Sequence, residues 1–122
     1  MAPYGSRMRT FSGDAAIPGI RALPLPGHTP GHTGYIVDGG GRRLLIWGDV
    51  MHMHDVQERR PDVGMVFDTD PAAAAASRRK ALDMAASERM MVAGMHLHFP
   101  AFVHVARAGN GYALVPEPWL AD

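Results

Sequence analysis

The segment 70–90 constrains the fold more than any other stretch, because it carries the strongest helix signal in the chain. Asp70 is a good N-cap residue, and Pro71 suits the first helical position. The sequence PAAAAASRRKALDMAASERM then follows with high helix propensity. We therefore predict one main helix over 71–90, after an irregular stretch that ends at Asp70.

Short apolar segments bounded by glycine or proline surround this helix and predict strands. These segments are 19–25, 33–38, 42–47 and 89–93. The glycines at 39–41 supply a turn between the second and third segments, and GNG at 109–111 supplies one in a closing hairpin over 102–119. The order predicts a single α/β domain over 1–122 with a mostly antiparallel or mixed sheet and one main helix.

The composition limits the chemistry that the chain can perform. Lys and Arg number 12, as do Asp and Glu, so the zero net charge gives no general reason to bind nucleic acid or an anionic membrane. The basic residues Arg78, Arg79 and Lys80 are interpreted as the solvated face of the helix. Because the chain has seven histidines and no cysteine, any metal site must use His, Asp and Glu.

The N-terminal sequence MAPYGSRMRT has no apolar stretch typical of a signal peptide, and no apolar run is long enough to span a membrane. We therefore favour a cytoplasmic location for a chain that starts at Met1. The natural N-terminus is nevertheless expected to lie upstream of Met1.

Three segments share one form, in which a strand is followed by glycine and then by a side chain that can bind metal. They are PGHT at His28, WGDV at Asp49 and AGMH at His96. Glycine beside each candidate ligand lets the backbone approach closely. Two imidazoles and a carboxylate suit zinc or a similar divalent ion, and ligands at several strand ends can converge on one rim.

These motifs and their spacing resemble the metallo-β-lactamase superfamily of hydrolases over about 2–119. The resemblance is closest to the branch that contains methyl parathion hydrolase, through GDVMHMHDVQ, RPDV, DTDPAAAAASRRKALD, HLHFPAFVHV and GYALVPEPW. It implies that His28 binds a first metal ion, Asp49 bridges two ions and His96 binds the second. It also implies an αββα sandwich, of which this chain would form the C-terminal part.

The function implied is that of a binuclear hydrolase, most simply with zinc. The ions would lower the pKa of a bridging water so that hydroxide attacks a small-molecule ester, lactone or phosphotriester. Asp49 would be the catalytic residue, in the sense that it fixes the distance between the ions.

One signature of the family, His-x-His-x-Asp-His, is missing from this chain. HMHD at 52–55 has one residue too few and no final histidine. We therefore expect the chain to be the C-terminal half of such an enzyme and to be inactive alone. The alternative is a non-catalytic truncated chain or one part of a split enzyme, and either would expose a sheet face to a second copy or to the absent half.

Several histidines keep more than one interpretation. His98 competes with His96 as the late ligand, and we favour His96 because it follows Gly-Met. His32 is expected to hydrogen-bond near the first metal or to pack beneath it. His52 either lines the substrate mouth or is an exposed loop residue, and His104 is expected to be structural. Trp47 and Phe67 are both assigned to the core in preference to a pocket wall.

Overall fold

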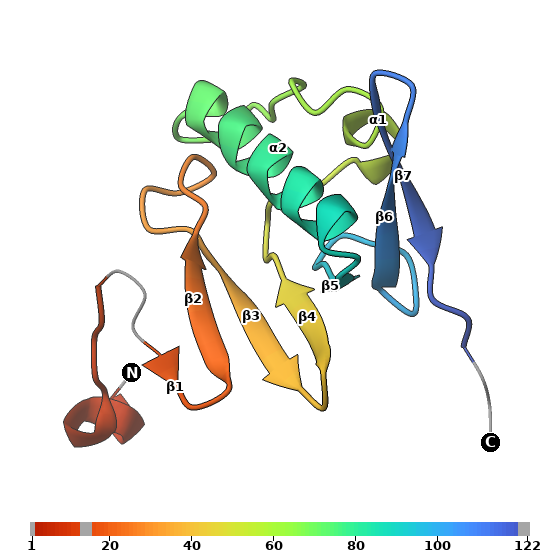
Figure 1. Cartoon of the computed structure of the whole chain (residues 1–122). Helices are drawn as coiled ribbons and strands as arrows, with labels where there is room; N and C mark the ends of the chain where they lie inside the picture. Colours follow the sequence, from red (N-terminus) through yellow and green to blue (C-terminus); the bar gives the residue numbers. More distant parts are fainter. Residues whose placement is uncertain (1, 13–15, 120–122) are drawn as a thin grey trace.

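The computed structural model describes residues 2–12 and 16–119. The described elements, in chain order, are η1 (a 3-10 helix, Ala2–Arg7), β1 (Ala16–Ile17), β2 (Ile20–Pro24), β3 (Thr33–Gly39), β4 (Arg42–Ile46), α1 (His54–Gln57), α2 (Pro71–Ser87), β5 (Met91–Ala93), β6 (Phe102–Ala108) and β7 (Gly111–Pro116). The strands form one sheet in chain order, and α2 lies across one of its faces (Figure 1). No helix among the described residues is long and apolar enough to cross a membrane.

The sheet is mixed, as the sequence predicts. Strands β4 and β5 are parallel and are connected through α2, whereas all other neighbouring strands are antiparallel. Consequently β2, β4 and β5 run in the same direction, and their carboxyl ends lie at the same edge of the sheet. The two predicted hairpins, β3–β4 and β6–β7, are both confirmed.

The core lies between the sheet and α2. Residues directly opposite one another on neighbouring strands form a buried row, in which Ile36, Leu45 and Val92 are each 0% exposed. From the helix, Leu82 and Ala85 belong to the same cluster and are also 0% exposed. Removing these apolar side chains from water is what holds α2 against the sheet.

The main helix is shorter than predicted. It begins at Pro71 with Asp70 as its N-cap, whose Oδ1 accepts a hydrogen bond from the Ala73 backbone N–H at 2.9 Å. It ends at Ser87, because Arg89 adopts φ +51°, which a continuing helix does not allow. For the same reason the next strand, expected at 89–93, begins only at Met91.

The interpretation of Arg78 as a solvated residue is wrong. Arg79 and Lys80 are exposed, but Arg78 is 1% exposed. The buried stripe of α2 runs through Ala74, Ala81 and Leu82, and helical periodicity places residue 78 on that stripe. Its guanidinium donates hydrogen bonds to backbone carbonyls, which compensates for its burial.

The stretch expected to be irregular contains the short helix α1, and the N-terminal η1 was also not predicted. Helix α1 has one turn and no side-chain cap at Met53, so local sequence gives little sign of it. Its position is fixed by contacts with β7, where the Tyr112 backbone N–H donates to the Glu58 carbonyl at 2.8 Å. Gly111 is required there, because a Cβ at that residue would lie 2.5 Å from the Arg59 carbonyl oxygen.

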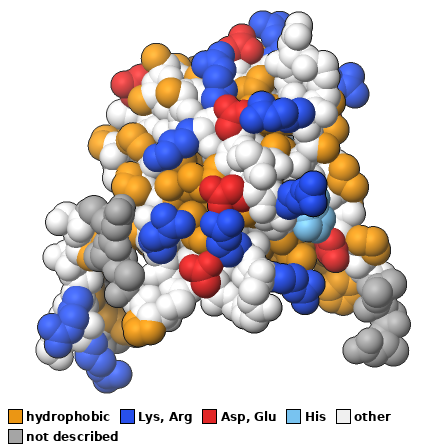
Figure 2. All heavy atoms as spheres, in the orientation of Figure 1, with side chains coloured by type: hydrophobic (Ala, Val, Ile, Leu, Met, Phe, Trp, Pro, Cys, Tyr) orange, Lys and Arg blue, Asp and Glu red, His pale blue; other side chains and the backbone are white. Residues whose placement is uncertain are grey.

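The second face of the sheet is only partly covered. Tyr35 on β3 and Phe102 on β6 belong to one row of paired residues across this face and are 36% and 37% exposed. An apolar hollow of about 670 Å³ lies over β2, β3 and β4, with Phe11 of the N-terminal segment on its rim. On the face seen in Figure 2, in contrast, acidic and basic side chains are interspersed, without a large area of one sign.

Tyr112 attaches the final hairpin to α2, and its replacement by phenylalanine tests that contact. Its hydroxyl donates to Asp83 Oδ1 at 2.6 Å. We expect Tyr112→Phe to lower the free energy of unfolding at pH 7 by about 1 kcal/mol, measured by urea denaturation. The same change at exposed Tyr4 should alter it by less than about 0.5 kcal/mol.

The effect of Tyr112→Phe should also depend on pH. Burial, and then the hydrogen bond to Asp83, raise the pKa of Tyr112 above its ordinary value. The folded chain therefore keeps the phenol protonated at a pH where the unfolded chain loses the proton. The contribution of Tyr112 is complete below about pH 10 and is lost as the pH rises through the folded-state pKa. A difference between the two proteins that stays constant from pH 8 to 11 would contradict this.

Candidate metal centre

The three segments with candidate ligands meet at one edge of the sheet. His28 lies in the loop after β2, Asp49 follows β4 and His96 follows β5. These are the strands that run in the same direction, so their carboxyl ends bring the loops together. The prediction that each segment follows a strand is confirmed, whereas metal binding by these residues stays a prediction.

Asp49 and His96 are in direct contact, although 47 residues separate them in the chain. His96 Nε2 lies 3.0 Å from Asp49 Oδ1. With His52 they form a group in which one ligand atom from each residue lies within 4.8 Å of the others. The side chains of His96 and Asp49 are 46% and 38% exposed, so the group lies at the surface of this chain.

His52 is the central imidazole of this edge. Its ring centroid is 4.5 Å from that of His96 and 4.8 Å from that of His28. Its Nδ1 is buried and has no hydrogen-bond partner among the described residues. Burial, and then the like charges of His96 and His28, lower the pKa of His52 below its ordinary value. The neutral imidazole, which is the form that binds metal, is therefore favoured.

His28 lies outside the three-residue group but next to it. Its Nδ1 is 3.1 Å from Oδ1 of Asp68, whose side chain is only 1% exposed. Burial opposes ionisation of Asp68, but hydrogen bonds from the Met65 N–H and from His28, together with nearby positive charge, lower the pKa of that carboxyl. A carboxylate on Nδ1 leaves Nε2 of the same ring available to a metal ion. Sequence reasoning missed Asp68; the one signal for it was the DTD sequence just before the helix.

His32 joins the loop after β2 to the loop after β4. Its Nδ1 contacts the Leu25 carbonyl oxygen at 2.8 Å, and its Nε2 accepts the Asp49 backbone N–H at 2.9 Å. Gly48 makes this approach possible, because a Cβ there would lie 2.8 Å from Nε2 of His32. Its φ of +59° also favours glycine. His32 thus orients the backbone of Asp49.

His98, Trp47 and Phe67 differ in their positions relative to this group. The rings of His98 and His54 meet edge to face with centroids 4.5 Å apart, and His98 is not in the group with Asp49. Trp47 is 0% exposed, which confirms its place in the core. Phe67 is not a core residue: it is 52% exposed, and its ring lies 4.9 Å from that of His52. It forms a wall beside the histidines.

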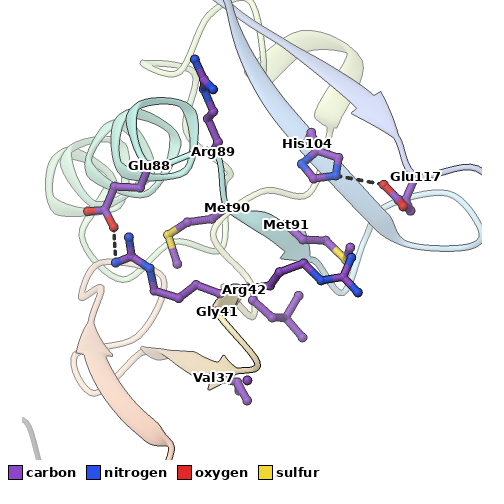
Figure 3. A pocket seen from close by; sticks show the side chains of 12 residues that line it. Val37, Gly41, Arg42, Glu88, Arg89, Met90, Met91, His104 and Glu117 are labelled. Atoms are coloured by element: carbon purple, nitrogen blue, oxygen red, sulfur yellow. Dashed lines mark hydrogen bonds and ion pairs between the residues drawn. The ribbon is translucent and has the colours of Figure 1, made fainter.

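A hollow of about 450 Å³ lies at the opposite edge of the sheet, and Figure 3 shows the side chains around it. Gly41 of the β3–β4 turn and Glu88 after α2 are on its rim, and His104 pairs with Glu117 at 2.9 Å on another side (Figure 3). None of the three grouped ligands lines it. The candidate metal centre lies away from this hollow, with the side chains of His96 and Asp49 at the surface of the chain.

The donor set fits a divalent ion such as zinc. Two imidazoles and a carboxylate are ordinary zinc ligands, and His52 contributes a buried ring nitrogen without a partner. Exposed acidic groups occur often without a metal, so the fit rests on the histidines.

Comparison with known proteins identifies the family. Residues 5–96 match the model of the metallo-beta-lactamase superfamily, which is most of the chain. The chain therefore belongs to the metallo-beta-lactamase superfamily. No curated protein sequence matches it.

Solved structures agree in fold. The hydrolase AbOPH of the beta lactamase superfamily is 32% identical, with a TM-score of 0.91, and the match covers 98% of this chain and 42% of that one. AidC, a dizinc quorum-quenching lactonase, is 25% identical, with a TM-score of 0.89 and coverage of 96% and 40%. A probable metal-dependent hydrolase from Staphylococcus aureus, 18% identical with a TM-score of 0.73, shares the fold. The chain thus spans about two fifths of the length of the first two.

Proposed function

We propose that this chain supplies part of the metal centre of a metal-dependent hydrolase with two divalent ions, most simply zinc. The observation that carries the proposal is the group formed by Asp49, His52 and His96, whose ligand atoms lie within 4.8 Å of one another. A divalent ion held there supplies Lewis acidity and lowers the pKa of water.

The residues of this chain have distinct roles in the proposal. In the proposal His96 and His52 would hold one ion, His28 would hold the other, and Asp49 would contribute its carboxylate to both. The Asp68 carboxylate contacts Nδ1 of His28, so that Nε2 of the same ring points away from Asp68. The motif resemblance favours His28 as the ligand that joins Asp49 and His96, whereas the distances between ligand atoms favour His52. The proposed arrangement uses both histidines.

For the substrate, we propose a small molecule with an ester or lactone bond, and a phosphotriester as a side activity. The support is the similarity of this chain to AidC, a lactonase, and to AbOPH, a hydrolase. The exposed ring of Phe67 beside His52 gives an apolar wall that suits the acyl part of such a substrate.

A second candidate is a chain that binds metal but does not catalyse by itself. It is favoured by the exposure of the side chains of Asp49 and His96 at the surface of this chain. In both accounts the open sheet face of Tyr35 and Phe102 is covered by further polypeptide, either the rest of a sandwich or a second copy.

The test is a chimera in which this chain replaces the matched segment of AbOPH. We expect zinc-dependent hydrolysis of an aryl ester, an acyl homoserine lactone or a phosphotriester, and no hydrolysis by the Asp49→Asn chimera. The 122-residue chain alone, loaded with zinc, should give little or no turnover. A folded, zinc-loaded chimera that cleaves none of these substrates would contradict the hydrolase proposal, and turnover by the chain alone would contradict its partial character.

A further inference from the structure

We propose that Arg78, a buried residue of α2, is a positioning residue for metal binding by Asp49 and His52. The inference rests on the proposed function, because it assumes that these two side chains are ligands. It extends that function to a residue that lies in the core and contacts no ligand side chain.

The guanidinium of Arg78 holds both ends of the loop that carries His52. Its Nε donates to the Val50 carbonyl at 2.8 Å, directly after Asp49 in the chain. Its Nη1 donates to the Pro61 carbonyl at 2.8 Å and to the Val63 carbonyl at 3.1 Å. Three carbonyls reached from one rigid planar group fix the loop more narrowly than one flexible ammonium could.

Gln57 carries the same constraint to the backbone of His52. It is 0% exposed, and its Nε2 donates to the Val63 carbonyl at 2.8 Å, the same oxygen that Arg78 contacts. Its Oε1 accepts the N–H groups of His52 and Met53 at 2.8 and 3.0 Å. A continuous hydrogen-bond chain therefore runs from α2 to the backbone of His52, the residue at the centre of the histidine group.

The test compares Arg78→Lys and Arg78→Met with Arg79→Met, a matched change at the exposed neighbouring residue. Ala81→Gly is a second control, because it weakens the same helix at a buried position without touching the loop. Two readouts are measured on the folded 122-residue chain. They are the zinc dissociation constant, by competition with a chromophoric chelator, and amide hydrogen exchange at His52 and Met53 without metal.

We expect both Arg78 variants to bind zinc about 10- to 100-fold more weakly, as is typical when a group that orients ligands is lost. Exchange at His52 and Met53 should be faster by at least about 10-fold, with the Lys variant less affected. Arg79→Met and Ala81→Gly should leave the zinc constant unchanged, although Ala81→Gly melts at a lower temperature.

Equal zinc binding by the unaltered chain and both Arg78 variants would overturn this inference and leave the proposed function standing. No zinc binding by the unaltered chain would overturn both. If the Met variant does not fold, the Lys variant decides alone. Failure of both to fold would also overturn the inference, since Arg78 would then serve the fold and not the site.

Discussion

Replacing Gly27 by alanine is expected to destabilise the chain by about 3–5 kcal/mol, enough to unfold much of a domain of this size. Gly27 has φ +133°, and a Cβ there would lie 2.0 Å from the backbone nitrogen of Ala74. That nitrogen belongs to the first turn of α2, which is fixed by its cap at Asp70. Either the loop with His28 or the start of the helix must move.

Gly31→Ala is the matched control for this prediction, because it lies in the same loop and has no atom within 4 Å of an added Cβ. Its effect should stay within about 0.5 kcal/mol. Urea denaturation at pH 7 measures both. Equal free energies of unfolding for Gly27→Ala and Gly31→Ala would contradict the close packing of this loop against α2.

Asp49→Asn is expected to weaken zinc binding by about 100-fold or more, the largest functional effect of a single change in this chain. The substitution keeps the size of the side chain but removes the negative charge of the carboxylate beside His96 and His52, which we propose as the anionic ligand. Competition titration with a chelator measures the dissociation constant, and circular dichroism verifies that the variant is folded.

The control for Asp49→Asn is His104→Ala. His104 lies on β6, pairs with Glu117 and is outside the histidine group. Its loss should leave zinc binding within about twofold, since it contributes no ligand to that group. An equal loss of zinc affinity in the two variants would mean that zinc binds to surface histidines in general. The grouped residues would then form no site.

The parts of the fold that local sequence determines were predictable. A capped run of alanine and other helix formers gives α2, and two-residue turns that contain glycine give the β3–β4 and β6–β7 hairpins. The end of α2 was not predictable, because Arg89 takes a positive φ that sequence assigns to glycine or asparagine. Helix α1 depends on contacts with β7, which no local pattern reveals.

The candidate site was predictable only in outline. Glycine before Asp49 and before His28 gave the loops, and parallel strand directions bring those loops together. The sequence does not predict which residues distant in the chain make contact with the site. Asp68 on His28 and the buried Arg78 under the loop both depend on how α2 packs against the sheet. Charge favoured a solvated Arg78, whereas its helical position placed it inside.

The central claim is that imidazoles and one carboxylate from separate strand ends hold divalent ions at one edge of the sheet. Long-range ¹H–¹⁵N NMR of the histidine rings during zinc addition tests it most directly. We predict that the ring nitrogens of His28, His52 and His96 shift together at stoichiometric zinc, while those of His98 and His104 do not. Shifts confined to His98 and His104, or spread evenly over all seven rings, would contradict the claim.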